Sequence, residues 1–180
     1  MDNIKVKSGK LIIVDPCYDA KDGVVINALN GTWTVTAGYN DEGVVAWINV
    51  IHSDYTNKVT DPCFFLSDFV VDSGQVGIFD YEYLMSHNDE SRDSEDTDCF
   101  YGKACELTSG DVDYIMHGII DQEGAVSATG YGDGEYSIFV DYEDSDHRTV
   151  VAVGITFADE TSDDDYDYEE YDEYDDTEES

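Results

Sequence analysis

Short stretches rich in β-branched and aromatic residues, each closed by turn residues, recur along most of this chain. We expect strands over residues 4–7, 10–14, 24–28, 32–39, 44–51, 64–71, 75–79, 125–129, 136–142 and 149–157. Turn dipeptides such as Asp22-Gly23 and Ser73-Gly74 separate them, and Asn30-Gly31 is typical of a type I′ hairpin turn. This pattern favours a mostly β fold: a twisted antiparallel sheet, a sandwich or an open barrel.

Pairing and helices follow from the same pattern. Residues 32–39 with 44–51, and 136–142 with 149–157, are expected to form antiparallel hairpins, with Trp33 and Val35 on one face of the first. Residues 99–107 have apolar side chains at helical spacing and predict a short amphipathic helix. Residues 112–120 fit either a helix or a strand. One or two short helices are therefore expected in a single β-rich domain over residues 1–158.

Charge sets the second constraint. The chain has 43 acidic and 8 basic residues, a formal net charge of −35. Residues 159–180 hold 14 acidic and no basic residues, and we expect them to form a disordered acidic tail. Residues 1–158 keep 29 acidic and 8 basic residues, a charge of −21. The acidic runs at 88–98 and 141–147 are expected to be a long mobile loop and a hairpin loop.

This charge excludes several classes of partner. Too few cations are present to neutralise a row of phosphates, so direct nucleic-acid binding is not expected, and an anionic membrane surface is disfavoured. No apolar run approaches the ~20 residues of a membrane span. The first residues lack a secretory pattern, so a cytoplasmic protein is expected, with its four cysteines reduced.

Three turn motifs carry the residues with chemical potential. They are the segments at Asp15-Pro16-Cys17-Tyr18, at Asp72-Ser73-Gly74-Gln75 through Asp80, and at Tyr131-Gly132-Asp133-Gly134. One interpretation is structural, with tight turns and a buried thiol. Another makes Cys17 a nucleophile with His52 or His117 as its base, although a negative field disfavours the thiolate. In a third, the carboxylates of these segments converge on Ca²⁺ or Mg²⁺; they are Asp15, Asp72, Asp80 and Asp133. No zinc-like spacing is present, and no cofactor is predicted.

The same motifs carry a resemblance to a known family. Residues 9–18 read GKLIIVDPCY, residues 71–80 VDSGQVGIFD and residues 127–140 SATGYGDGEYSIFV, with FYGKACELT between them and a closing strand VVAVGITF. In this order they resemble a small domain family of unknown function from Firmicutes and their phages, over about residues 8–157. The resemblance implies a small, mostly β, intracellular protein and no established activity. It does not extend to the acidic tail.

We therefore expect a phage-type, non-enzymatic binding protein. Its acidic surface would occupy a basic, nucleic-acid-binding site on a host protein, as a DNA mimic inhibits a defence or nucleic-acid enzyme. The contact residues expected are the acids of the two loops: Asp89, Glu90, Asp93, Glu95, Asp96, Asp98, Asp141, Glu143, Asp144 and Asp146. The alternative is a small β-domain enzyme or metal-dependent module that uses the three turn motifs. A structural or assembly protein is a third. A single acidic face favours mimicry, and glycine turns that converge in a pocket favour the module.

Overall fold

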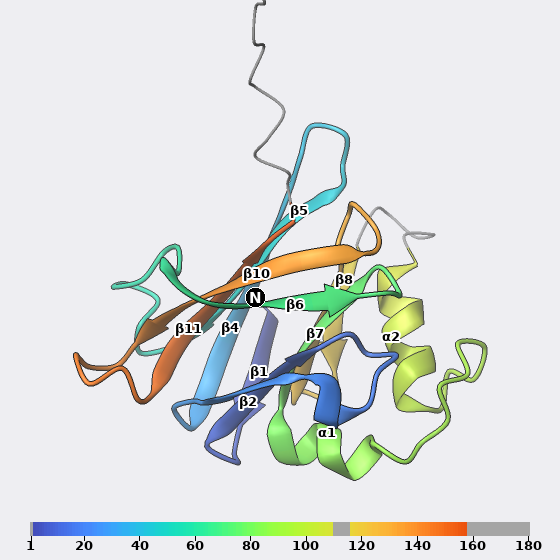
Figure 1. Cartoon of the computed structure of the whole chain (residues 1–180), viewed down its shortest axis with the longest axis horizontal. Coiled ribbons are helices and arrows are strands. Elements are labelled where there is room, and N and C mark those ends of the chain that lie inside the picture. Colours follow the sequence, from blue (N-terminus) through green and yellow to red (C-terminus); the bar gives the residue numbers. More distant parts are fainter. Residues whose placement is uncertain (1, 110–115, 158–180) are drawn as a thin grey trace, which may run out of the picture.

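A computed structural model describes residues 2–109 and 116–157, which form two antiparallel sheets and two helices (Figure 1). The six-stranded sheet has the order β1-β4-β5-β11-β10-β6 and the five-stranded sheet the order β3-β2-β7-β9-β8. The first comprises β1 (Asp2–Val6), β4 (Gly31–Tyr39), β5 (Val45–His52), β11 (Val150–Thr156), β10 (Gly134–Tyr142) and β6 (Phe64–Val71). The second comprises β3 (Val24–Asn27), β2 (Lys10–Val14), β7 (Gln75–Asp80), β9 (Gly124–Ala128) and β8 (His117–Ile120). The expected mostly β, sandwich-like fold is confirmed.

All ten expected strand ranges are strands, and both expected hairpins pair as antiparallel neighbours. The alternation in β4 is also as expected, because Trp33 and Val35 are both buried. Residues 117–120 of the ambiguous segment form β8, while residues 112–115 lie outside the described residues. The hairpin expected at Asn30-Gly31 is wrong. β3 and β4, on either side of it, belong to different sheets, and only Gly31 of the pair has a positive φ.

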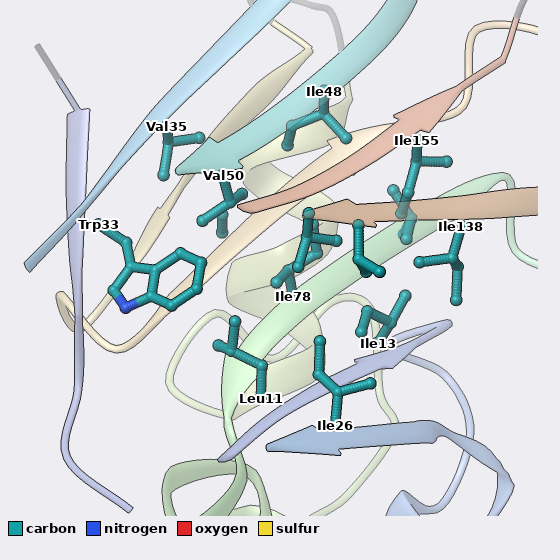
Figure 2. Packing of buried hydrophobic residues seen from close by; sticks show 14 of the residues in the cluster. Leu11, Ile13, Ile26, Trp33, Val35, Ile48, Val50, Ile78, Ile138 and Ile155 are labelled. Carbon is teal, nitrogen blue, oxygen red and sulfur yellow. The ribbon is translucent and has the colours of Figure 1, made fainter. Parts of the chain in front are cut away.

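The main core lies between the two sheets (Figure 2). Inward side chains of β4, β5, β10 and β11 meet those of β2, β3 and β7, for example Val50 and Ile138 against Ile13 and Ile78. β4 and β10 alternate between more and less buried residues, whereas the central strands β5 and β11 are buried along most of their length. Burial of this apolar surface, worth roughly 25 cal/mol per Å², holds the sheets together.

The helices cover the other face of the five-stranded sheet. α1 (Tyr81–His87) and α2 (Phe100–Thr108) pack Tyr83, Leu84 and Phe100 against Ile12 and Phe79. Both faces of β7 and β9 are consequently buried along their whole length. The molecule has three layers, and no described helix lies over the outer face of the six-stranded sheet.

Asp80 explains where α1 begins. Its Oδ1 accepts from the backbone amides of Glu82 and Tyr83 at 3.0 and 3.2 Å, which is an N-cap. Its Oδ2 accepts from the amides of Lys7 and Ser8 at 2.7 and 2.8 Å, so the same carboxylate fixes the β1–β2 turn. Burial alone would raise the pKa of Asp80, but these hydrogen bonds outweigh it and lower the pKa below its ordinary value.

The single domain expected over residues 1–158 stays a prediction in its bounds, and the described residues all fall within it. The expected disordered tail, residues 159–180, lies outside the described residues. Within the described ranges, no helix has the length and apolar character needed to cross a membrane.

Candidate functional site

The first two turn motifs meet at Asp15, which is fully buried. Its Oδ2 accepts from the backbone amides of Asp72 and Ser73, both at 2.8 Å. Its Oδ1 accepts from the amide of Cys17 at 2.9 Å and from the Ser73 hydroxyl at 2.5 Å. Four donors thus satisfy the carboxylate, which holds the end of β2 against the β6–β7 turn. Asp15, where these two motifs meet, therefore has a structural role.

Cys17 follows directly and is poorly suited to nucleophilic catalysis. Burial, and then the hydrogen bond and charge of Asp15, raise the pKa of its thiol to about 12. A thiol with that pKa is almost wholly protonated near pH 7, so the reactive thiolate is scarce. Tyr18 lies at the surface beside it, where its hydroxyl donates to Asp72 Oδ2. This hydrogen bond raises the pKa of Tyr18 to about 12.

We call the contact between the end of β2 and the β6–β7 turn the Asp15 junction. Gln75 connects this junction to α2. Its Nε2 donates to the sulfur of Cys105 at 3.5 Å, and its Oε1 is buried without a partner. Burial and a hydrogen bond with Cys105 raise the pKa of Tyr101 to about 12. All four cysteines of the chain are free thiols.

The four carboxylates proposed for a divalent ion do not all come together, since only Asp15 and Asp72 are neighbours. The carboxylate oxygens of Asp15 and Asp80 accept hydrogen bonds from backbone amides at opposite ends of the β2–β7 pair. Asp133 lies on an exposed turn. In the described part of the chain, no group of three or more His, Cys, Asp or Glu is placed to hold a metal ion. The Ca²⁺ or Mg²⁺ site stays a prediction without a supporting geometry.

The third turn motif lies next to the Asp15 junction, which it contacts through the backbone just before it. The side chains of Tyr131 and Asp133 are exposed. The Thr129 amide donates to the Gly74 carbonyl at 2.9 Å, and the Thr129 and Tyr136 hydroxyls both donate to the Gly132 carbonyl. Tyr131 is 49% exposed, and Asp133 is exposed too. This turn forms one wall of a groove at β10 and β11 of the six-stranded sheet, and residues 61–63 form another.

This acidic groove, as we call it, has a volume of about 910 Å³. Its walls and floor are formed by Asp61, Pro62, Cys63, Tyr131, Asp133, Glu135, Ser137, Phe139 and Thr156, with Gly134, Tyr136 and Phe157. The wall at 61–63 repeats the Asp-Pro-Cys of the first motif, but here Asp61 is exposed where Asp15 is buried. Pro62 packs over Gly154, where a side chain would come within 3.1 Å of the proline ring.

The groove is lined by carboxylates and by no cationic side chain. Cys63 donates from its sulfur to Asp141 Oδ1 at 3.7 Å, and burial together with the charge of Asp61 raises the pKa of Asp141. On the adjacent strand, Asp68 accepts from the Ser137 hydroxyl at 2.6 Å. We call Asp61, Asp68, Asp133, Glu135 and Asp141 the acidic face. Asp61, Asp68 and Glu135 were not among the expected site residues, although the alternation along β10 already placed Glu135 and Asp141 on one side.

The ten loop acids expected to bind a partner lie in two separate places. The loop between α1 and α2 carries six of them and the β10–β11 hairpin the other four; Figure 1 shows these loops at opposite ends of the molecule. They do not form one contiguous face. Only the hairpin group adjoins the acidic face, through Asp141.

Arg92 holds the α1–α2 loop in place. Its guanidinium donates to the carbonyls of Tyr18, His87, Asn88 and Glu90 at 3.0–3.4 Å and lies 5.6 Å from the centre of the Phe100 ring. Several acids here bind their own backbone: Glu90 Oε2 accepts from the amide that begins α2, and Asp93 and Asp96 accept from amides two residues on. The expected long loop is present, and several of its carboxylates accept hydrogen bonds that hold the loop in its own conformation.

Comparison with protein-family models, with curated proteins and with solved structures finds no match to this chain.

Proposed function

We propose that this chain is a non-enzymatic binding protein whose acidic face engages a basic segment of another protein. The observation that carries the proposal is the acidic groove: a hollow over β10 and β11, with three carboxylates and no cation among its lining residues. Carboxylates crowded in this way repel one another, and a partner that supplies Lys or Arg relieves the repulsion.

The apolar part of the groove suits such a partner. Tyr131 and Phe139 line it beside Asp133 and Glu135. Lys and Arg side chains have long apolar stems that pack on aromatic rings while their charged ends reach carboxylates. A groove with only carboxylates would attract cations without selecting among them. Aromatic floor and acidic rim together select an extended basic side chain.

The spacing of the carboxylates indicates whether the partner is a short basic segment or a complete DNA-binding cleft. β10 has nine residues and spans roughly 30 Å. Glu135 and Asp141 stand along it and Asp133 and Glu143 flank its two ends, with Asp61 and Asp68 beside them, or about one carboxylate per 5 Å. Duplex DNA has one phosphate per ~1.7 Å of axis. The described face is too sparse to imitate a duplex, so we propose that it binds one basic loop or strand.

Nucleic-acid-binding proteins are the class of partner that we propose, because they display clustered Lys and Arg. The resemblance to phage proteins adds a host cell as the setting, with inhibition of a defence or nucleic-acid enzyme as the outcome. The 14 acidic residues at 159–180 support this proposal as a source of long-range attraction.

The test uses a fluorescein-labelled nonapeptide of alternating Lys and Val, and a Glu-Val peptide as its control. Anisotropy titrations compare the full chain with a groove variant, Asp61→Asn/Asp133→Asn/Glu135→Gln. A loop variant, Asp89→Asn/Glu95→Gln/Asp98→Asn, removes the same charge from exposed positions between the helices. We expect the groove variant to bind the Lys-Val peptide about tenfold more weakly and the loop variant to match the parent.

Equal losses in the two variants would mean that only net charge matters, and the groove would then have no special role. Failure of the Lys-Val peptide to bind more tightly than the Glu-Val peptide would overturn the proposal itself.

A further inference from the structure

Strand β6 lies at the edge of the six-stranded sheet. It is eight residues long and pairs with β10 alone among the described strands. Its other side therefore presents backbone N–H and C=O groups without a partner strand. Proteins usually keep such edges short or covered, because a free edge pairs with other chains.

The side chains of β6 make this edge unusual. Phe65 is 59% exposed, Val70 54% and Phe64 46%, and Asp68 stands among them. A hollow of about 440 Å³ runs beside the strand, lined by Asp68, Phe69 and Val70 of β6 and by Tyr18, Asp22 and Val24 from the region of β3. Since β3 is the edge strand of the other sheet, the hollow lies between two open sheet edges.

Charge decides what fits this edge. A second copy would bring its own Asp68 toward the first, in a chain with a net charge of −35. Residues 159–180 of the same chain hold 14 acidic and no basic residues, so the edge repels them too. A basic segment meets Asp68 and Asp22 with the opposite sign.

We propose that an extended basic segment of the partner adds to the open edge of β6 as a further strand. Its Lys or Arg side chains lie on the side of Asp68 and the acidic face, and its alternate apolar side chains enter the hollow against Phe69 and Val24. Main-chain hydrogen bonds provide affinity and the alternating pockets provide specificity, as in other cases of strand addition. This inference rests on the proposed function and specifies how the partner binds.

Backbone methylation tests the inference directly. Successive residues of a strand direct their N–H groups to opposite edges. Two forms of the Lys-Val nonapeptide, one N-methylated at every Lys and one at every Val, therefore each block a different edge. We expect one form to bind the full chain more than about tenfold more weakly than the parent peptide and the other within about twofold. We also expect the parent peptide to slow hydrogen exchange at alternate amides of residues 64–71.

A matched pair of variants supplies the second measurement. Asp68→Asn should weaken binding of the parent peptide about threefold or more. Asp41→Asn removes one exposed charge from the β4–β5 turn and should leave binding unchanged. If the parent peptide binds but the two methylated forms bind alike and the β6 amides stay unprotected, strand addition is wrong while the proposed function stands. If no form binds, the proposed function fails as well. Self-association of the protein through protected β6 amides would show that the occupant is a second copy, contrary to the charge argument.

Discussion

Ser73 donates to the buried carboxylate of Asp15 through both its backbone amide and its hydroxyl, across 58 positions of the sequence. Asp15→Asn turns one acceptor oxygen into an NH₂ group that faces donors whichever way the amide turns. We expect a loss of about 2–4 kcal/mol in the free energy of unfolding, because buried amides are left unsatisfied. Urea denaturation measures it, with the exposed substitution Asp133→Asn as the control. A loss below about 1 kcal/mol would contradict the structural role of Asp15.

Asp80 predicts a pH dependence. Its folded pKa lies below the ordinary value of 3.8, so its contribution to stability is complete above that pH and is lost as the pH falls through the folded pKa. The difference in unfolding free energy between the parent protein and Asp80→Asn should be largest above about pH 5 and should shrink toward pH 2. Urea titrations at several pH values measure this difference. A difference that grows in acid would mean that the carboxylate is not stabilised in the folded state.

Cysteine labelling tests the environment of Cys17. With a pKa of about 12, its thiol should react with iodoacetamide at pH 8 on the order of a thousandfold more slowly than an ordinary thiol. Cys63 is exposed and should be labelled before it. Mass spectrometry of digests over time follows each site, and unfolding in urea should make all four equally reactive. Rapid labelling of Cys17 in the native protein would revive its candidacy as a nucleophile.

Gly132 in the third turn motif and Gly130 just before it allow the effect of a close contact to be distinguished from the effect of a positive φ. Gly130 and Gly132 both have positive φ values, 73° and 84°. A Cβ on Gly130 would lie 2.2 Å from the Val45 carbonyl oxygen, whereas a Cβ on Gly132 meets nothing within 4 Å. Gly132→Ala should cost about 1 kcal/mol of stability and Gly130→Ala at least about 3, with loss of peptide binding in the second. Thermal melts and anisotropy give both results; equal effects would contradict the predicted contact.

The acidic run at the C-terminal end predicts a kinetic effect. Deletion of residues 159–180 changes the formal net charge from −35 to −21, by removing 14 acidic residues. Distant charges steer association more than they hold the complex, so binding to an immobilised Lys-Val peptide should become slower with an unchanged dissociation rate. The groove variant should instead dissociate faster. Surface plasmon resonance at low and physiological salt separates the two rates, and an identical effect of both changes on dissociation would refute this division of roles.

The strands were predictable because alternation and turn residues are local properties. β8 escaped prediction because its four residues, His117–Ile120, are too short for alternation to be distinguished from a helical pattern. α1 was missed for a similar reason, although Asp80 as an N-cap residue, with Glu82 in the first turn, is a readable helix-start signal. Asn30-Gly31 misled because a turn dipeptide predicts reversal only when the strands on either side pair, and here the chain changes sheets.

The candidate site was predictable only in part. The motif at Asp15 and the one at Ser73 were recognised separately, but their contact depends on how β2 and β7 pair. The two acidic loops were plain in the sequence, and nothing local indicated that they would lie at opposite ends of the fold. The acidic groove required the meeting of residues 61–63 with the turn at 131–134 across β10 and β11, which is a property of the finished sheet.

The position of β11 has a consequence for how the chain is made. This strand lies between β5 and β10, near the centre of the six-stranded sheet, yet it is the last of the described strands to leave the ribosome. Until residue 156 is synthesised, β5 and β10 each have an open edge, and the two halves of the sheet have no shared strand. A nascent chain that stalls before Val150 therefore exposes two apolar edges at once, a state prone to aggregation and dependent on chaperones.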